Sequence, residues 1–375
     1  MIQPESKPLA DIAESVRYGY TASATREPVG PHFLRITDIV PLQIDWDSVP
    51  YCTIDEKNLE RYRLQPGDIV VARTGATVGY AKLIRDERDA VFASYLVRFR
   101  FDSSEVEPGY IGRVLESDMY KRFVLSRVGG AAQPNANAKV LSAFPLPLPP
   151  LDTQKRIASI LSAYDDLIEN NRRRIQLLGQ SARLLFKEWF VHLRFPGHEH
   201  AKIKDGIPEK WEKKTLGEVV PLKYGKTLKQ DDRIPGPYPV FGSSGVVGFH
   251  NKALVQGPGI IVGRKGNVGS VYWSATDYHP IDTVYFIDSE NCNFYLFYAL
   301  LNTAFISTDV AVPGLNRNFA HSRTFLMPEQ KILRLFEEFV TPLHGQINNL
   351  RKYNDSLKKA RDILLPRLMN GEVTL

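Results

Sequence analysis

The feature that most constrains the fold of this chain is that the same plan of residues occurs twice along it. Three landmarks carry the repetition: a Tyr-Gly pair, a glycine-rich run around an arginine, and an asparagine further on. The paired residues, first copy then second, are Tyr18 and Tyr224, Arg73 and Arg264, and Asn135 and Asn316. Their separation falls from 206 to 191 to 181 positions, as expected for a duplicated unit that lost residues in its second copy. The sequence therefore predicts two similar domains.

The regions around these landmarks, 1–150 and 213–327, predict mixed α/β domains. Short β-prone runs alternate in them with Gly, Pro and Asp turns. These runs are 68–72, 90–101, 259–263 and 283–287. Short amphipathic helices are expected late in each region, at 110–124 and 294–306. The expected fold class is α+β.

Each mixed region is followed by a long helix, predicted at 151–192 and 328–370, with a linker at 193–212 and a tail at 371–375. Apolar residues recur there in alternating steps of four and three, the pattern of a coiled-coil seam. The expected seam residues are Leu161, Ile168, Asn171, Ile175, Leu178 and Leu185, with Phe336, Leu343, Gln346, Leu350, Leu357 and Leu364. We expect an antiparallel pair of helices, and the alternative is two amphipathic helices that each pack on their own domain. The seam amides, Asn171 and Gln346, either fix the register or lie half-exposed without that role.

Charge alone does not identify a partner. The chain has 48 basic and 42 acidic residues, for a net charge of +6, and residues 1–150 are net negative. Two cysteines, Cys52 and Cys292, are too few for a disulfide framework. The first residues lack the apolar core of a signal peptide, and no apolar run is long enough for a membrane span. We therefore expect a cytoplasmic protein without membrane contact.

No motif in the sequence predicts catalysis or a metal site. The run Tyr224-Gly-Lys-Thr227 lacks the earlier glycine of a phosphate-binding loop, where Val220 stands. The glycines of 257–269 lack the strand-glycine-helix context of a dinucleotide site. His198-Glu-His200 lies in the linker without further ligands nearby. By elimination, the chain is a binding protein or a subunit whose partner performs the chemistry.

Polar and basic residues on the loops around the landmarks are the candidates for DNA contact, since Arg and Asn can read base edges and glycines admit phosphate. In the first copy these are Tyr18, Tyr20, Thr21, Arg26, Arg35, Arg73 and Thr74. In the second copy they are Lys223, Lys226, Lys229, Arg233, Ser243, Ser244, Arg264, Lys265 and Asn267. The alternatives are a structural hairpin whose arginine closes a local ion pair and an ordinary solvated surface.

Taken together, these residues resemble the specificity subunit of type I restriction-modification systems over about 9–373. Six motifs support the resemblance. They occur in a fixed order, and several of them occur in both copies. They are Pro147-Leu-Pro-Pro-Leu-Asp-Thr-Gln-Lys-Arg-Ile157, Trp211…Thr215-Leu-Gly-Glu218, Tyr238-Pro-Val-Phe-Gly-Ser-Ser-Gly245, Gly263-Arg-Lys-Gly266, Ile281-Asp-Thr283 and Met327-Pro-Glu-Gln-Lys-Ile332.

The resemblance implies two target-recognition domains, 1–150 and 213–327, that each read one half of a bipartite site in double-stranded DNA. The long helices would set the gap between the halves and dock two methyltransferase subunits, and restriction subunits would join them in phage defence. S-adenosylmethionine, ATP and magnesium are then expected on the partner subunits and not on this chain, which is expected to be non-catalytic. The first domain lacks a counterpart of Trp211, and since the domains differ, the site is expected to be asymmetric.

Two other functions remain open from the sequence. A coiled-coil scaffold with tandem protein-binding domains would use the same helices without DNA contact. An enzyme would hold a nucleotide at Gly257–Gly269. Salt-dependent retention on DNA and nucleotide titration distinguish these alternatives.

Overall fold

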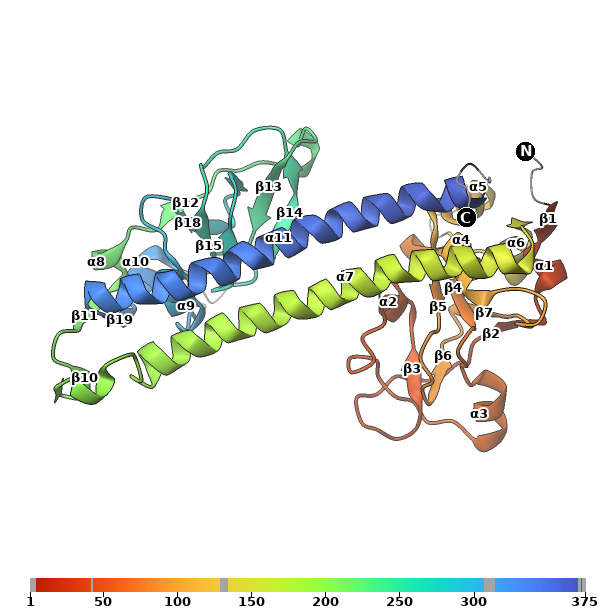
Figure 1. Ribbon diagram of the computed structural model, residues 1–375, viewed down its shortest axis with the longest axis horizontal. Coiled ribbons are helices and arrows are strands. Elements are labelled where there is room, and N and C mark those ends of the chain that lie inside the picture. The colour runs from red at the N-terminus through yellow and green to blue at the C-terminus, as the bar shows by residue number, and fades with distance from the viewer. Residues whose placement is uncertain (1–4, 42, 129–133, 307–313, 370–371, 373–375) are drawn as a thin grey trace. The chain divides into compact units, whose positions relative to one another are not determined.

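A computed structural model describes residues 5–41, 43–128, 134–306, 314–369 and 372 of the chain (Figure 1). The predicted tail at 371–375 thus lies almost wholly outside the described residues. The chain divides into two compact units, Met1–Glu169 with Asn354–Leu375, and Asn170–Tyr353. Each unit combines one mixed domain with a part of both long helices. The expected α+β fold, with two similar domains and a pair of long helices, is confirmed.

The first unit is built on a four-stranded antiparallel sheet with the order β2-β7-β4-β5. Its strands are Ser15–Tyr18 (β2), Leu96–Arg100 (β7), Ile69–Ala72 (β4) and Ala81–Leu83 (β5). A parallel pair, His32–Leu34 (β3) with Ala90–Phe92 (β6), and an antiparallel pair, Glu5–Pro8 (β1) with Pro145–Leu148 (β8), complete the strands of this unit. Strand β4 is buried along its whole length, as expected for a central strand rich in Ile and Val.

The first unit also contains short helices. They are Leu9–Ile12 (α1), Ile36–Ile39 (α2), Glu56–Tyr62 (α3), Pro108–Glu116 (α4), Asp118–Arg127 (α5) and Ala138–Ser142 (α6), with a 3-10 turn at Gly75–Thr77. Of these helices, α4 packs on β5 and α6 on β2. The single helix expected at 110–124 is two helices, because Ser117 between α4 and α5 is extended, with φ −76° and ψ 160°. Gly112 of α4 packs against Leu83 of β5, where an added Cβ would lie 2.9 Å from the leucine Cβ.

The second unit repeats this topology. Its main sheet has the order β12-β18-β15-β16, formed by Lys223–Tyr224, Val284–Ile287, Gly259–Gly263 and Val271–Ser274. Tyr238–Gly242 (β13) pairs in parallel with His279–Pro280 (β17) and antiparallel with Gly245–His250 (β14). Glu212–Thr215 (β11) pairs with Thr324–Met327 (β19) as β1 pairs with β8. The same strand order in both units is the structural form of the sequence repeat.

The remaining elements of the second unit are short. The helices are Leu216–Val219 (α8), Phe294–Leu301 (α9) and Arg317–His321 (α10), with 3-10 turns at His198–His200 and Gln230–Asp232. A small hairpin in the linker pairs Ile203–Lys204 (β9) with Ile207–Pro208 (β10). Helix α9 ends at Leu301, five residues before the end of the expected helix at 294–306.

The structure corrects one landmark of the repeat. Asn137 caps α6 by accepting a hydrogen bond from the Val140 N–H at 2.9 Å, and Asn316 caps α10 by accepting from Asn318 N–H at 2.8 Å. Asn137, not Asn135, is therefore the counterpart of Asn316. Gly19 and Gly225 are true counterparts, because a Cβ on either would lie about 2 Å from a backbone oxygen, at 2.2 and 2.1 Å.

The long helices are Leu151–Phe186 (α7), continued by a π-helical segment at Lys187–Val191, and Gln330–Met369 (α11). They are antiparallel within each unit. In the first unit, Asn354 Nδ2 donates to the Ile168 carbonyl oxygen at 3.2 Å. In the second unit, the Trp189 and Phe336 ring centroids lie 5.9 Å apart. No helix among the described residues is long and apolar enough to span a membrane.

The seam of α11 differs by one position from the prediction over part of its length. Gln346 is exposed and the adjacent Ile347 is buried. Val340 is likewise buried, whereas Phe339 beside it is 54% exposed. Leu161, Ile168 and Asn171 of α7 are buried, and Phe336 and Leu357 are buried on α11. The other predicted seam residues, Ile175, Leu178, Leu185, Leu343, Leu350 and Leu364, are half-buried. The buried amide of α11 is Asn354, and Gln346 is solvated.

Candidate nucleic-acid interface

In the first unit, three loops bring a tyrosine, an arginine and an asparagine together. The Arg73 guanidinium carbon lies 4.9 Å from the centroid of the Tyr18 ring. Its Nη2 donates to Asn135 Oδ1 at 3.3 Å, and the Tyr18 hydroxyl accepts from the Ala138 N–H at 2.8 Å. Tyr18 ends β2, Arg73 follows β4, and Asn135 precedes α6, so the sheet edge and one helix start define this group. We call Tyr18, Arg73 and Asn135 the first cluster.

The second unit has the equivalent group at the equivalent places. The Arg264 guanidinium carbon lies 5.0 Å from the Tyr224 ring centroid and 5.8 Å from that of Tyr285. Its Nη1 donates to the Asp282 carbonyl oxygen at 3.1 Å. The Arg317 guanidinium carbon also lies 5.0 Å from the Tyr224 ring. We call Tyr224, Arg264 and Arg317 the second cluster. Sequence reasoning gave Tyr18, Arg73 and Arg264 as candidate contacts. It used Tyr224 and Asn135 only as landmarks of the repeat, and it missed Arg317.

Backbone pairing shows that the two clusters are counterparts. The carbonyl oxygen of Arg73 accepts from Ala136 N–H, and that of Arg264 accepts from Leu315 N–H, both at 2.8 Å. Each arginine is followed by a glycine in the left-handed region, Gly75 at φ +74° and Gly266 at φ +79°. Left-handed backbone favours glycine, so these glycines let the loop turn immediately after the arginine.

Two tyrosine rings of the second unit lie against the guanidinium of Arg264. Burial raises the pKa of Tyr285 to about 12, and its hydroxyl donates to the Leu315 carbonyl oxygen at 2.8 Å. The Tyr224 ring is 47% exposed and meets the Tyr285 ring at a centroid distance of 5.0 Å. A guanidinium held over a tyrosine face keeps its N–H donors in a fixed plane. The arrangement can present paired donors to a base edge or a phosphate.

Outside the two clusters, three of the candidate cations are engaged in contacts within the protein. Arg35 forms a two-pronged ion pair with Asp38, at 3.0 and 2.9 Å, and Lys223 pairs with Asp288. Arg233 donates from Nη1 to the Val247 carbonyl oxygen at 2.7 Å and so holds its loop against β14. For these three residues, the structure favours the interpretation as local structural contacts.

The other candidates divide by exposure. Arg26, Lys226, Lys229 and Lys265 are exposed, as are Thr21, Ser244 and Asn267. Tyr20 is half-buried and its ring lies 5.3 Å from that of Tyr62. Half-buried Thr74 forms a β-bridge with Asn135, and the Ser243 carbonyl oxygen accepts from the Tyr272 hydroxyl at 3.2 Å. Of the candidates in the described part of the chain, the structure brings together Tyr18 and Arg73, and also Ser243 and Asn267, whose carbonyl oxygens both accept from Ser270 Oγ.

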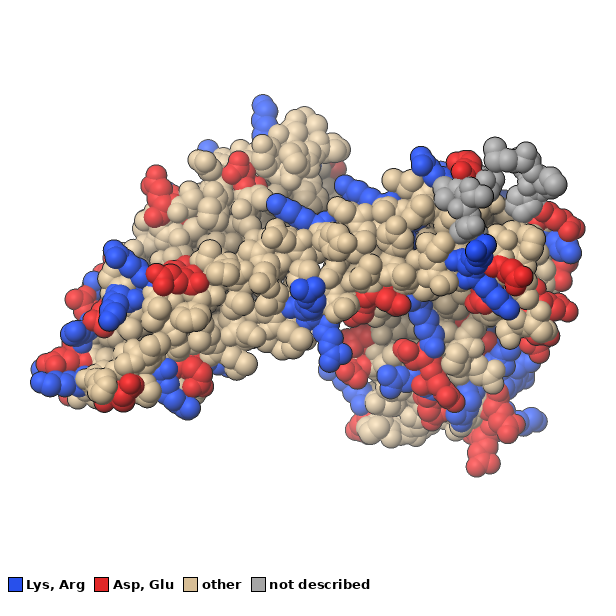
Figure 2. Space-filling model, in the orientation of Figure 1, with Lys and Arg blue, Asp and Glu red and all other residues tan. Residues whose placement is uncertain are grey.

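The visible face of the molecule carries Lys and Arg interspersed with Asp and Glu (Figure 2). This agrees with the weak net charge of +6. On this face, the cations do not form one broad basic stripe (Figure 2).

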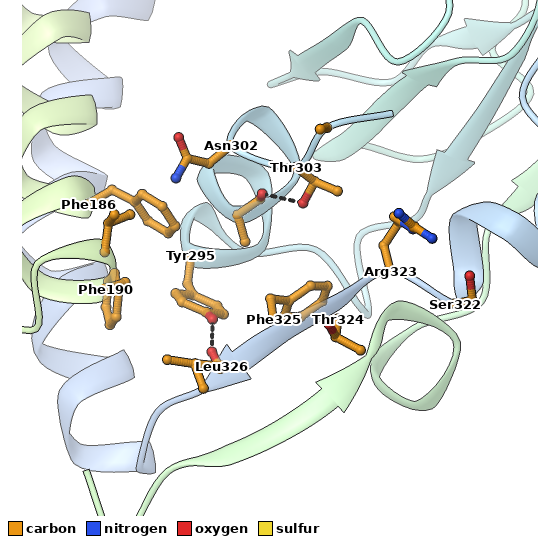
Figure 3. A pocket seen from close by; sticks show the side chains of 13 residues that line it. Phe186, Phe190, Tyr295, Asn302, Thr303, Ser322, Arg323, Thr324, Phe325 and Leu326 are labelled. Carbon is orange, nitrogen blue, oxygen red and sulfur yellow. Dashed lines mark hydrogen bonds between the residues drawn. The ribbon is translucent and has the colours of Figure 1, made fainter. Parts of the chain in front are cut away.

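A hollow of about 590 Å³ lies in the second unit, away from these clusters. Phe186 and Phe190 form one side, Phe325 and Thr324 of β19 the other, and Tyr295 lies between them (Figure 3). The Tyr295 hydroxyl donates to the Leu326 carbonyl oxygen, and Thr303 Oγ1 donates to the Ala299 carbonyl oxygen at 2.8 Å. These hydroxyls are thus already hydrogen-bonded. Among the described residues, no group of three His, Cys, Asp or Glu side chains is arranged to hold a metal.

Comparison with known proteins agrees with this architecture. The family model described as "Type I restriction modification DNA specificity domain" matches residues 5–180 and 208–319, one match in each half of the chain. The protein therefore belongs to the family of type I restriction-modification specificity subunits.

Relatives extend over most of the chain. The type I restriction enzyme MjaIX specificity subunit of Methanocaldococcus jannaschii is 25% identical over 83% of this chain and 79% of its own length. The HindI specificity subunit of Haemophilus influenzae is 23% identical over 83% of this chain and 87% of its own length. The crystal structure of the S subunit from M. genitalium has a TM-score of 0.57 at 17% identity, covering 98% of this chain and 99% of that one. It shows the same fold.

Proposed function

We propose that this chain is the non-catalytic DNA-reading subunit of a type I complex, in which each domain reads one half of an asymmetric bipartite site. The observation that carries the proposal is the pair of clusters, where an arginine lies over a tyrosine at equivalent loops of two duplicated domains. Paired guanidinium donors match guanine O6 and N7 in the major groove and also match phosphate oxygens.

The clusters differ in ways that favour an asymmetric site. Asn135 offers an amide to Arg73 in the first cluster, and the bridge position in the second unit is Gly314. Ala138 begins α6, whereas Arg317 begins α10. Two domains with different side chains at the same place would read different bases, so the two half-sites would not be a palindrome.

We further propose that α7 and α11 set the gap between the half-sites. The helices contain 36 and 40 residues, which is about 54 and 60 Å at 1.5 Å per residue. One turn of duplex is about 34–36 Å. Unbroken helices of this length support a fixed gap of at least one turn.

Docking of two methyltransferase subunits on the same helices is part of the proposal. Ile160, Leu167, Leu177 and Leu184 of α7 are exposed, at 38%, 46%, 52% and 60%. Large exposed apolar side chains on a helix favour a protein partner. In this scheme S-adenosylmethionine, ATP and magnesium act on the methyltransferase and restriction subunits, and the complex works on DNA in the cytoplasm.

Methylation mapping of a host with and without this gene tests the function. We expect one bipartite motif with an unread gap, present only when the gene is present. A continuous motif, or a methylation pattern that does not depend on the gene, would contradict the proposal. The scaffold alternative predicts that the purified complex does not bind DNA at any ionic strength, whereas DNA reading predicts binding that weakens steeply with salt.

A further inference from the structure

Arg317 places a second guanidinium beside Arg264. Both guanidinium carbons lie 5.0 Å from the centroid of the same Tyr224 ring, so they are at most about 10 Å apart. Arg317 is exposed at the start of α10, and Tyr224 is nearly half-exposed. Two cations are thus presented at one aromatic ring that solvent can reach.

Within the part of the chain that the structure describes, no acidic side chain forms an ion pair with these cations. Among the described residues, neither Arg264, Lys265 nor Arg317 forms an ion pair, and Arg264 Nη1 donates to an uncharged group, the Asp282 carbonyl oxygen, at 3.1 Å. Lys223, adjacent to Tyr224, is by contrast neutralised by Asp288. Because like charges repel, an uncompensated group of this kind is most stable with an anion bound.

Among the residues that the structure describes, the first cluster has no such second cation. The position that corresponds to Arg317 is Ala138, since Asn137 and Asn316 cap the equivalent helices α6 and α10. The Ala138 N–H is bonded to the Tyr18 hydroxyl at 2.8 Å, and Arg73 is bonded to an uncharged amide. The duplicated site has therefore acquired an extra charge in one copy only.

We infer that Arg317 contacts a backbone phosphate of the DNA bound by the second unit, so that this unit grips its half-site more strongly than the first unit does. The inference rests on the proposed function. Arg264, which follows β15, donates a hydrogen bond to the Asp282 carbonyl oxygen. The Arg317 side chain has no hydrogen bond among the described residues. A free, exposed guanidinium suits a phosphate, whose oxygens accept from its paired donors in any sequence context.

The test measures equilibrium binding of the complete complex, with its methyltransferase subunits, to DNA with and without its mapped motif over a range of salt concentrations. We expect Arg317→Ala to weaken binding about tenfold on both DNAs and to reduce the slope of log affinity against log salt by about one. Arg317→Lys keeps the charge and should preserve the slope. Arg334→Ala, which removes an exposed arginine from α11, is the matched control and should leave binding unchanged.

A gain-of-function variant makes the test independent of any loss of folding. Ala138→Arg places the second guanidinium in the first cluster, where the backbone N–H bond to Tyr18 does not depend on the side chain. It should strengthen binding and raise the slope by about one. If wild-type complex binds DNA but Arg317→Ala alters neither affinity nor slope, the inference is wrong. A loss confined to one base pair of the motif, with the slope unchanged, would also overturn the phosphate role. Absence of DNA binding by the wild-type complex would instead refute the proposed function.

Discussion

Arg361 of α11 donates from Nη1 to Asp165 Oδ1 of α7 at 2.6 Å. Asp165 also accepts from Arg85 Nη2 at 3.1 Å and forms an ion pair with Arg113 of α4. Its side chain is only 5% exposed. One carboxylate thus joins both long helices to the mixed domain of the first unit. Burial opposes the charge on Asp165, but the three guanidiniums outweigh it and hold the pKa of the carboxyl below its ordinary value.

Asp165→Asn should destabilise the first unit by about 3 kcal/mol, because the buried guanidinium of Arg113 loses one of its two carboxylate partners and keeps only Glu116 at 3.5 Å. Hydrogen exchange of the full chain, followed by peptide, measures it. We expect faster exchange in α4 and in the end of α11, with 170–353 unchanged. Asp166→Asn, at the exposed neighbour, is the control. Equal exchange in both variants would show that Asp165 does not hold the helices to this domain.

The same carboxylate predicts the acid behaviour of the first unit. The folded pKa of Asp165 lies below its unfolded value, so its contribution to stability is complete above about pH 4. That contribution is lost as the pH falls through the folded pKa. The stability difference between wild type and Asp165→Asn should therefore be constant near neutrality and shrink below pH 4, as measured by urea denaturation across pH. A difference that does not change with pH would contradict this assignment.

His344 should make the stability of the second unit depend on pH in a higher range than the one in which Asp165 affects the first unit. Its ring stacks on Phe294 with centroids 4.0 Å apart, and its Nε2 lies 2.8 Å from the Tyr298 hydroxyl oxygen. Burial, with a smaller effect of Arg351, lowers the pKa of His344 to about 4. Below pH 6.5 the unfolded chain binds a proton that the folded chain excludes, so stability falls as the pH drops from 6.5 to 4, by about 3 kcal/mol in total.

His344→Phe should remove this part of the pH dependence in thermal or urea unfolding. His200→Gln, at an exposed histidine, should retain it. Glu337, whose pKa burial raises, contributes with the opposite sign in both variants, so the difference from wild type isolates His344. A His344→Phe profile parallel to that of wild type between pH 4 and 6.5 would falsify the prediction.

Arg73→Ala and Arg264→Ala should each alter one half of the recognised site. Each removes the guanidinium of a single cluster, and a lost bidentate base contact costs about 1–3 kcal/mol of discrimination. Methylome sequencing of hosts that carry either variant would reveal it as relaxed sequence preference in one half, a different half for each variant. Relaxation of both halves by a single variant, or of neither, would contradict the assignment of one cluster to one half-site.

Seven residues inserted into both long helices should lengthen the unread gap by about three base pairs, since seven residues add about 10 Å and a base pair about 3.4 Å. Gly179 and Gly345 are suitable sites, because an added Cβ at either meets nothing within 4 Å. They lie ten residues before Trp189 and nine after Phe336, at about the same level of the antiparallel pair. Methylome sequencing should show the same half-sites with a longer gap.

Insertion into α7 alone is the control for this experiment. It changes the register of one helix against the other and should abolish methylation, because the seam residues no longer meet. An unchanged gap after insertion into both helices would mean that the helices do not set the spacing.

The repeat and the long helices were predictable because local patterns define them: glycines at obligatory turns, and apolar residues at helical spacing. The seam of α11 was harder to predict from the sequence. Phe339 and Val340 are both apolar, and periodicity alone does not decide which of two adjacent apolar residues is buried. The structure buries Val340, Ile347 and Asn354, so the steps from Ile332 run four, four and three before the heptad resumes. The buried seam amide of α11 is consequently Asn354, whereas the heptad pattern predicted Gln346.

The residues of the two clusters likewise include some that the sequence predicted and one that it did not. Sequence spacing found Arg73 and Arg264, because glycines on both sides make their loops recognisable. It could not separate cations engaged inside the protein, such as Arg35 and Lys223, from free ones, since their acidic partners depend on the fold. Arg317 was missed because it has no cationic counterpart in the first copy: an alanine, Ala136 or Ala138, stands opposite it whether Asn316 is paired with Asn135 or with Asn137.

The composition of the first unit has a consequence for biosynthesis. Leu365, Leu368 and Met369 of α11 lie in its core together with Ile157 and Leu161. A ribosome releases residues 170–353 before the segment that closes this core, although most of the first domain was made earlier. Domains generally fold as units during synthesis. The second unit can therefore complete its core before the first unit does, because the core of the first unit is complete only once the end of α11 has been made.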